Sequence, residues 1–85
     1  MFDFLITQDF TDSLFRLDKK VQEDIKSKLR FLSRTENPMF FAKKLKGCKD
    51  IFRFRVGDYR IIFRATKNSI ILLMAKHRKD VYEGL

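Results

Sequence analysis

The amino-acid sequence predicts an α+β domain spanning residues 1–85, in which an N-terminal strand and a helical hairpin precede a three-stranded antiparallel meander. Two patterns lead to this fold class. Apolar residues alternate with period two near the N-terminus and again after residue 50, and they recur every three or four residues in between. The chain has 85 residues, 45% of them hydrophobic and ten of them Phe, which suits one small domain with a dense core. The resulting four-stranded sheet is expected to carry both helices on one face.

A short strand at residues 2–6 and two consecutive helices are expected to open the chain. Thr7 or Asp9 is expected to cap the first helix, and Asp18 the second, because these side chains accept hydrogen bonds from free backbone N–H groups. The Asn37-Pro38 step ends the hairpin. Apolar residues three or four apart give each helix one stripe, formed by Phe10, Leu14 and Leu17 in the first helix and by Val21, Ile25, Leu29 and Leu32 in the second.

Residues 39–47 are expected to form a loop or a single helical turn. Either conformation brings Lys43, Lys44 and Lys46 to the surface. Phe40 and Phe41 are expected in the core or at a contact with a partner rather than as platforms on which bases stack. If they are exposed, they indicate a protein interface.

The next two strands form a hairpin with a basic face. Residues 51–56 and 59–66 alternate, and Gly57-Asp58 between them is typical of a two-residue turn. Such a turn fixes the register and pairs Arg55 with Arg60. The apolar side chains then share one face, and the other face carries the basic side chains Arg53, Arg55, Arg60 and Arg64.

The end of the chain is expected to add a central strand and a tail. A turn at residues 67–69 leads to a nearly continuous apolar strand at residues 70–75, which is typical of a strand covered on much of both faces. Residues 76–85 are expected to form a polar tail. The sheet face away from the helices is expected to be open and basic.

The net charge of +8 lies entirely in residues 43–85, since residues 1–42 carry equal numbers of acidic and basic side chains. This asymmetry predicts a polyanionic partner: nucleic acid, an acidic protein or a membrane surface. The clustered arginines fit an anion site, because guanidinium groups bind phosphate oxygens bidentately. The structural alternative is that long arginine side chains cover apolar surface while their charged ends stay in water.

The tail combines a further set of reactive side chains. His77 is a candidate general base or acid near neutral pH, and Arg78 is a candidate for stabilising charge on a phosphate. Tyr82 is a candidate for stacking on a base or holding a hydroxyl group. The structural alternatives are a solvated surface His and a Tyr that anchors packing.

Several classes of protein do not fit the sequence. One Cys and one His disfavour a metal site, the three glycines form no phosphate-binding loop, and acidic residues are too sparse after residue 43 for a two-metal nuclease. No cofactor is expected. With only one Cys, a reducing, cytoplasmic compartment is expected. The longest apolar run, residues 70–75, is far short of a membrane span, and no basic leader is visible at the N-terminus, so neither a membrane segment nor a secretory signal is expected. If RNA is cut here, its own 2′-hydroxyl can attack phosphorus without a metal.

Three sequence blocks in order, LKG, RVGDYRIIF and HRKDVY, resemble the RelE/ParE superfamily of bacterial and archaeal toxins. The resemblance covers essentially the whole chain and implies a RelE-like fold. RelE-type members cut mRNA in the ribosomal A site, whereas ParE-type members inhibit DNA gyrase and cleave no RNA. Both types imply a cognate antitoxin that wraps the toxin, and through which the complex binds operator DNA. A small basic RNA-binding domain without toxicity is a third interpretation.

The RelE branch, the leading hypothesis, implies roles for particular residues in contact with the ribosome and mRNA. The implied catalytic residues are Arg53, Arg55, Arg60, Arg78 and Tyr82, and the RNA- or ribosome-binding residues are Lys43, Lys44, Lys46, Arg64 and Lys76. Arg53 and Arg55 stand where the family pattern has lysines. Because arginine is effectively never deprotonated, these two would bind phosphate, and His77 becomes a substitute candidate for the general base.

Overall fold

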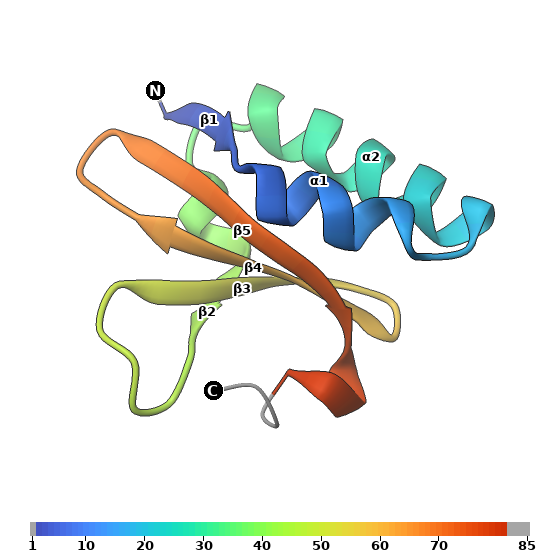
Figure 1. Ribbon diagram of the computed structural model, residues 1–85. Helices are drawn as coiled ribbons and strands as arrows, with labels where there is room; N and C mark the ends of the chain where they lie inside the picture. Colours follow the sequence, from blue (N-terminus) through green and yellow to red (C-terminus); the bar gives the residue numbers. More distant parts are fainter. Residues whose placement is uncertain (1, 82–85) are drawn as a thin grey trace.

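The chain folds into two layers, with two helices packed on one face of a five-stranded sheet (Figure 1). The computed structural model describes residues 2–81; that a single domain spans residues 1–85 stays a prediction. Within residues 2–81, no helix has the length and apolar content to cross a membrane. The elements, in chain order, are β1 (Asp3–Ile6), α1 (Gln8–Phe15), α2 (Lys19–Arg34), the 3-10 turn η1 (Pro38–Phe41), β2 (Ala42–Lys44), β3 (Ile51–Val56), β4 (Tyr59–Ala65), β5 (Ser69–His77) and the 3-10 turn η2 (Arg78–Asp80).

The strands lie in the order β1-β5-β4-β3-β2, so β5, β4 and β3 form the centre of the sheet. β1 pairs with β5 in parallel, and the other neighbours are antiparallel. The predicted hairpin register is confirmed, because Arg55 lies opposite Arg60 and Phe54 opposite Ile61. Gly57 supplies the positive φ of 58° that the turn requires.

The helical layer is attached to β5 by two side chains of the first helical segment. Thr7, one of the two predicted caps, accepts a hydrogen bond from the backbone N–H of Phe10 and donates one to the carbonyl of Leu72 at 2.7 Å. Ser13 accepts a hydrogen bond from the N–H of Ala75 at 2.8 Å. These bonds fix α1 beside β5. Asp18 stands at the predicted N-cap of α2 but makes no capping hydrogen bond with its side chain.

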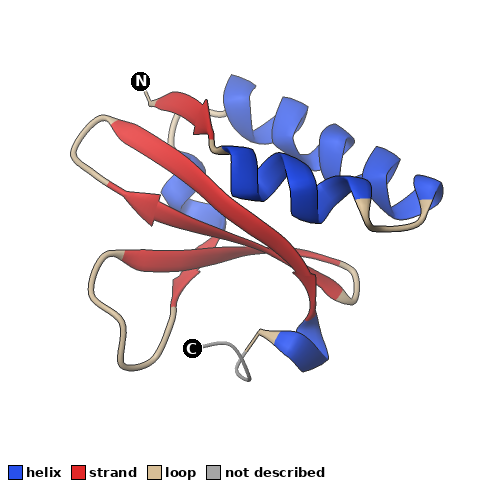
Figure 2. Ribbon diagram, in the orientation of Figure 1, coloured by secondary structure: helices blue, strands red, loops and turns tan. Residues whose placement is uncertain are grey.

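The main core lies between the helices and the sheet (Figure 2). Phe54 and Phe63 stack at 4.3 Å between ring centroids and are fully buried. The predicted helical stripes are confirmed, since their residues are buried in this core or partly buried against it. The fully buried members include Phe10, Ile25, Leu32, Ile61 and Ile70.

Three predictions about the sheet need correction. The sheet has five strands rather than four, because residues 42–44 pair with β3. β5 continues to His77, so the first two residues of the predicted tail belong to a strand. The face away from the helices is also not fully open, because Leu45, Ile62 and Val81 form a small second core there. Figure 1 shows η2 turning to this side of the sheet, opposite the helices.

Replacing a central core residue tests this packing. Phe54→Ala is expected to lower the free energy of unfolding by about 3–5 kcal/mol, because it removes a stacked, fully buried ring and leaves a cavity. Urea denaturation measures the change. Phe40→Ala is the control, because this side chain is largely exposed. A loss at Phe54 no larger than that at Phe40 would contradict the packing described.

Candidate functional site

A row of positive charges crosses three adjacent strands on the sheet face away from the helices. Arg55 of β3 lies opposite Arg60 of β4, and Arg60 in turn lies opposite Lys76 of β5. Arg53 lies two residues before Arg55 and therefore shares its face. We call this row the cation row (Arg53, Arg55, Arg60 and Lys76). Like charges in directly opposite positions destabilise a sheet, so the pairing itself adds no stability to the fold.

Arg60 is the centre of the cation row. Its Nη1 donates hydrogen bonds to the backbone carbonyls of Gly57 and Tyr59, both at 2.9 Å, which hold the guanidinium beside the turn. Burial is the largest cause that lowers the pKa of this group. The positive charges that lower it further are those of Arg53, Arg55 and Arg78, and Asp58 acts in the opposite direction. Arginine nevertheless stays protonated at neutral pH, so the site is a concentrated positive field.

Arg78 comes close to this row through the turn between β3 and β4. Its backbone N–H donates to the carbonyl of Asp58 at 2.7 Å, and its Nε lies 3.7 Å from the Asp58 Oδ1. The ion pair is solvent-exposed and adds little stability by itself. The backbone hydrogen bond is therefore what positions η2 against the hairpin and brings Arg78 near Arg60.

His77 does not join the cation row. It lies opposite Tyr59, whose side chain faces the helices, and the two rings meet edge to face at 5.1 Å. Its Nδ1 accepts a hydrogen bond from the N–H of Lys79 at 3.1 Å. With Ser13 and Arg16 it lines an open pocket of about 580 Å³ on the helix side. The structure thus separates His77 from the arginines of the cation row, and its role as general base stays a prediction that this placement disfavours.

A β-bulge explains why His77 lies on the helix side and Lys76 lies beside Arg60. The sequence predicted Lys76 only as an RNA- or ribosome-binding residue. Ile62 pairs with Met74 but Phe63 pairs with Leu72, so Leu73 is an extra residue in β5. The alternation of faces reverses after it. Without the bulge, the pattern of β5 would direct His77 toward the arginines and Lys76 toward the helices.

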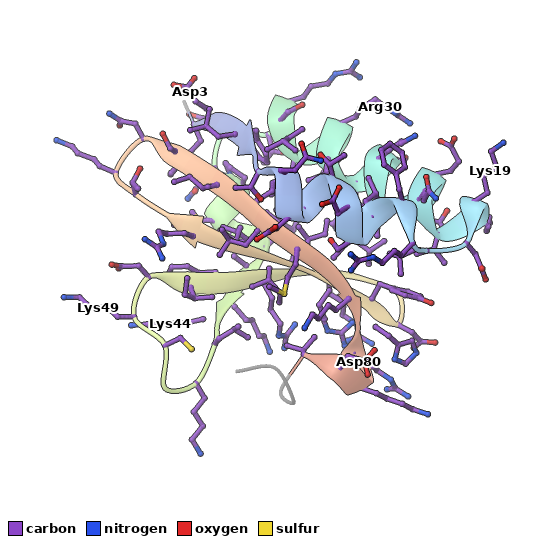
Figure 3. All side chains as sticks on the ribbon, in the orientation of Figure 1. Asp3, Lys19, Arg30, Lys44, Lys49 and Asp80 are labelled. Atoms are coloured by element: carbon purple, nitrogen blue, oxygen red, sulfur yellow. The ribbon has the colours of Figure 1, made fainter. Side chains whose placement is uncertain are left out.

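The remaining predicted residues lie around the cation row. Lys43 of β2 lies opposite Arg53 and shares its face, whereas Lys44 lies opposite Phe52 on the other face. Lys44 and Lys46 border a shallow pocket of about 450 Å³ at the loop between β2 and β3. Figure 3 shows Lys44 and Lys49 at this end of the molecule.

Two predicted residues stand apart from this group. Arg64 is on the face of Arg60 but four residues along β4, a separation of about 13 Å. Tyr82 lies outside the described residues, and its role stays a prediction. Among residues 2–81, no three His, Cys, Asp or Glu side chains gather as metal ligands would.

The fold and the cation row can now be compared with known proteins. The family model described as ParE toxin of type II toxin-antitoxin system, parDE, matches residues 4–82. The chain belongs to this family. The resemblance to the RelE/ParE superfamily read from the three sequence blocks is thereby confirmed.

The named relatives are RelE-type toxins. Toxin RelE3 of Methanocaldococcus jannaschii is 42% identical over 41 residues, an alignment that covers 48% of this chain and about half (47%) of the relative. The toxin in the RelB-RelE antitoxin-toxin complex from Methanococcus jannaschii superposes with a TM-score of 0.78 at 25% identity, over 95% of this chain and 98% of that one. The archaeal RelE-RelB complex from Pyrococcus horikoshii OT3 gives 0.68 at 26% identity, over 91% and 94%. The predicted RelE-like α+β fold is confirmed.

Repulsion within the cation row leads to a stability prediction. Arg55→Gln is expected to stabilise this toxin at low salt by about 0.2–1 kcal/mol, because it removes a positive charge directly opposite Arg60. The gain is expected to shrink as salt screens the charges. Urea denaturation at low and high salt measures it, with Lys67→Gln, an exposed cation in the turn between β4 and β5, as the control. Equal stability of Arg55→Gln and the natural chain at low salt would show that the arginines do not repel appreciably.

Proposed function

We propose that this type II toxin is a ribosome-dependent endoribonuclease that cuts mRNA in the A site. The observation that carries the proposal is the cation row, in which three neighbouring strands present positive charges to one place on the sheet face away from the helices. A phosphodiester lying across Arg55, Arg60 and Lys76 would be held from several directions. Such clamping orients the RNA and stabilises the charge that develops on the phosphorus centre.

The reaction needs no water and no metal at the attacking step. The 2′-oxygen of the RNA forms a new bond to the adjacent phosphorus, and the bond from phosphorus to the 5′-oxygen breaks. The products are a 2′,3′-cyclic phosphate and a 5′-hydroxyl. The proton of the 2′-hydroxyl passes to a nonbridging oxygen of the attacked phosphate, and one proton must reach the departing 5′-oxygen.

The proton for the leaving oxygen can come from Lys76. The guanidinium groups of Arg55 and Arg60 effectively never release a proton, whereas a lysine ammonium can. Lys76 is the member of the cation row that lies directly beside Arg60 on β5. In this proposal the arginines bind phosphate, Arg78 stabilises charge from the turn side, and Tyr82 orients the RNA by stacking or a hydrogen bond.

The outlying cations fit contacts with the ribosome. Lys43 extends the face of Arg53 across β2, and Lys46 and Arg64 are exposed at the edges of the same half of the molecule. Contacts of this kind are made with RNA phosphates and are weakened by salt. The activity is placed in the cytoplasm, where mRNA is translated.

A cognate antitoxin is proposed as the protein partner, and apolar surface at β1 supports it. Leu5 and Ile6 are 50% and 63% exposed on this edge strand. Beside them lies a groove of about 310 Å³ whose lining includes the apolar Phe4, Ile6, Leu29 and Leu72 and the cations Lys26 and Arg30. An acidic, partly helical partner would cover this groove. Complexes of RelE with RelB have been solved for the two archaeal relatives, and binding of operator DNA is expected through the antitoxin.

The second candidate function is inhibition of DNA gyrase without RNA cleavage, favoured by the ParE description of the matching family model. In that case the basic face is a protein-contact surface. Losses of single arginines should then weaken inhibition gradually, since no one group is required for chemistry.

A translating extract distinguishes these functions. The purified chain is expected to cut mRNA within the A-site codon, mapped by primer extension of 5′ ends. Arg60→Ala and Tyr82→Ala are expected to abolish the cuts because they remove the central phosphate ligand and the residue that orients RNA. Arg16→Ala, an exposed arginine on the helix side, is the matched control and should cut normally.

Three outcomes would contradict the proposal or its residue assignment. Full cutting by a triple variant of Arg60, Arg78 and Tyr82 to Ala would remove these residues from the site. Intact mRNA together with gyrase poisoning on supercoiled DNA would favour the ParE-type function. Intact mRNA, active gyrase and salt-sensitive RNA binding would leave a basic RNA-binding domain.

Lys76→Arg tests the proton donor separately from phosphate binding. The variant keeps the positive charge but cannot donate the proton, so its single-turnover cleavage rate is expected to fall by about 10²-fold or more with little change in RNA affinity. Lys76→Met should lose both rate and affinity. An unchanged rate in Lys76→Arg would show that the proton reaches the 5′-oxygen from another group.

A further inference from the structure

Three phenylalanines form an exposed cluster where the C-terminal half of α2 meets η1. Phe31 is 49% exposed, Phe40 81% and Phe41 38%. Phe41 packs edge to face against both Phe31 and Phe40, with ring centroids 5.3 Å apart in each pair. The rings therefore support one another but leave a large part of their surface to solvent.

Positive charges surround these rings. The Nζ of Lys28 lies 5.6 Å from the Phe31 ring centroid and 5.5 Å from that of Phe41, within the range of cation–π attraction. Arg30 and Arg34, one helical turn apart, border a pocket of about 370 Å³ with Phe31 as its aromatic wall. Figure 3 shows Arg30 on the side of α2 away from the sheet. We define the Phe31 patch as Lys28, Arg30, Phe31, Arg34, Phe40 and Phe41.

Among residues 2–81, no carboxylate lies within salt-bridge distance of Arg30 or Arg34. Within residues 2–81 the ion pairs are Lys20–Asp24 and Arg78–Asp58, and neither involves the Phe31 patch. Like charges four residues apart weaken a helix. As in the cation row, the repulsion between Arg30 and Arg34 lowers the stability of the fold. A bound polyanion would neutralise these charges.

The surroundings of the rings favour RNA over protein as the ligand. The groove beside β1 is lined mainly by the apolar side chains of Phe4, Ile6, Leu29 and Leu72, which suits a protein partner, and Lys26, Arg30 and Ser33 complete its lining. The pocket at Phe31 has one aromatic wall, two guanidinium groups, and the hydroxyl-bearing residues Ser27 and Thr35. An exposed ring beside cations is how proteins bind single-stranded nucleic acid, because bases stack on the ring and phosphates meet the cations. This departs from the expectation that exposed Phe40 and Phe41 indicate a protein interface.

We propose that the Phe31 patch is a second RNA contact of this toxin, which holds one unstacked nucleotide with its base against Phe31 and a phosphate on Arg30 and Arg34. The patch belongs to the helical layer, but Lys28 and Phe31 also line a pocket of about 530 Å³ together with Arg55 of the cation row. The second contact would therefore hold a nucleotide close to the segment that is cut. The proposal rests on the proposed function only in taking RNA as the polyanion.

Binding to a fluorescein-labelled, single-stranded 2′-O-methyl RNA tests the proposal, because this probe has no free 2′-hydroxyl and cannot be cut. Phe31→Leu keeps an apolar side chain but removes the aromatic face. Its affinity, measured by fluorescence anisotropy, is expected to fall about tenfold, within the range for one stacked base. Phe15→Leu is the matched control, since Phe15 is 62% exposed on α1 outside the patch, and its affinity should not change. Circular dichroism checks that both variants fold.

The charged half of the patch has its own readout. The double variant Arg30→Gln and Arg34→Gln is expected to lower the slope of log affinity against log salt by about 1.4, corresponding to two lost phosphate contacts. The control double variant, Arg16→Gln and Lys67→Gln, removes two charges outside the Phe31 patch and should lower this slope less. A series of probes, each with an abasic site at a different position, locates the stacked base. With one of these probes Phe31→Leu should no longer lower the affinity, because the base that stacks on Phe31 is missing.

The outcomes separate this proposal from the proposed function. Unchanged affinity of Phe31→Leu for every probe would overturn the second RNA contact, whatever the chain does to mRNA. A Phe31→Leu variant that binds RNA normally but fails to bind a co-expressed antitoxin would assign the patch to protein. A concentration-dependent dimer that Phe40→Leu abolishes would assign it to self-association. A tenfold loss of RNA affinity in a chain that cuts no mRNA would support the contact and count against the nuclease.

Discussion

The two-residue turn between β3 and β4 is the constraint on which both the core and the cationic face depend. Gly57 adopts a φ of 58°, and the pairing of Val56 with Tyr59 follows directly. Every second residue then faces the helices, so Phe54 and Phe63 stack in the core while the intervening arginines reach the other face. A slip by one residue would bury guanidinium groups under the helices, which costs far more than their mutual repulsion on an open face.

Elements whose apolar residues recur with one regular period were predictable from the sequence. The hairpin register, with Arg55 opposite Arg60, is the best example. β2 was not, because it is three residues long and two of them are lysines, a composition typical of protected sheet edges as well as of loops. The extent of β5 was missed because polar residues end its apolar run at residue 75. The bulge at Leu73 has no sequence signature, so the sequence could not show that Lys76 lies beside Arg60 while His77 lies beside Tyr59 on the helix side.

Three regions of the surface of this toxin differ in their chemistry. The cation row is a cluster of positive charges, the groove beside β1 is lined mainly by apolar side chains, and the Phe31 patch combines rings with cations. Each of these regions is energetically unfavourable in the isolated chain, either because like charges repel or because apolar surface contacts water. Binding of a partner would relieve these costs. The domain tolerates such surfaces because its stability comes mainly from its buried core.

The bulge in β5 also bears on how such a site can change during evolution. Because Leu73 is the extra residue of the strand, its removal by a single codon deletion would restore regular alternation without changing the pairing of the residues that follow. Lys76 would stay beside the arginines, and His77 would stay on the side of the helices. A strand with one residue too many can therefore lose a residue at this point and keep the same side chains at the site.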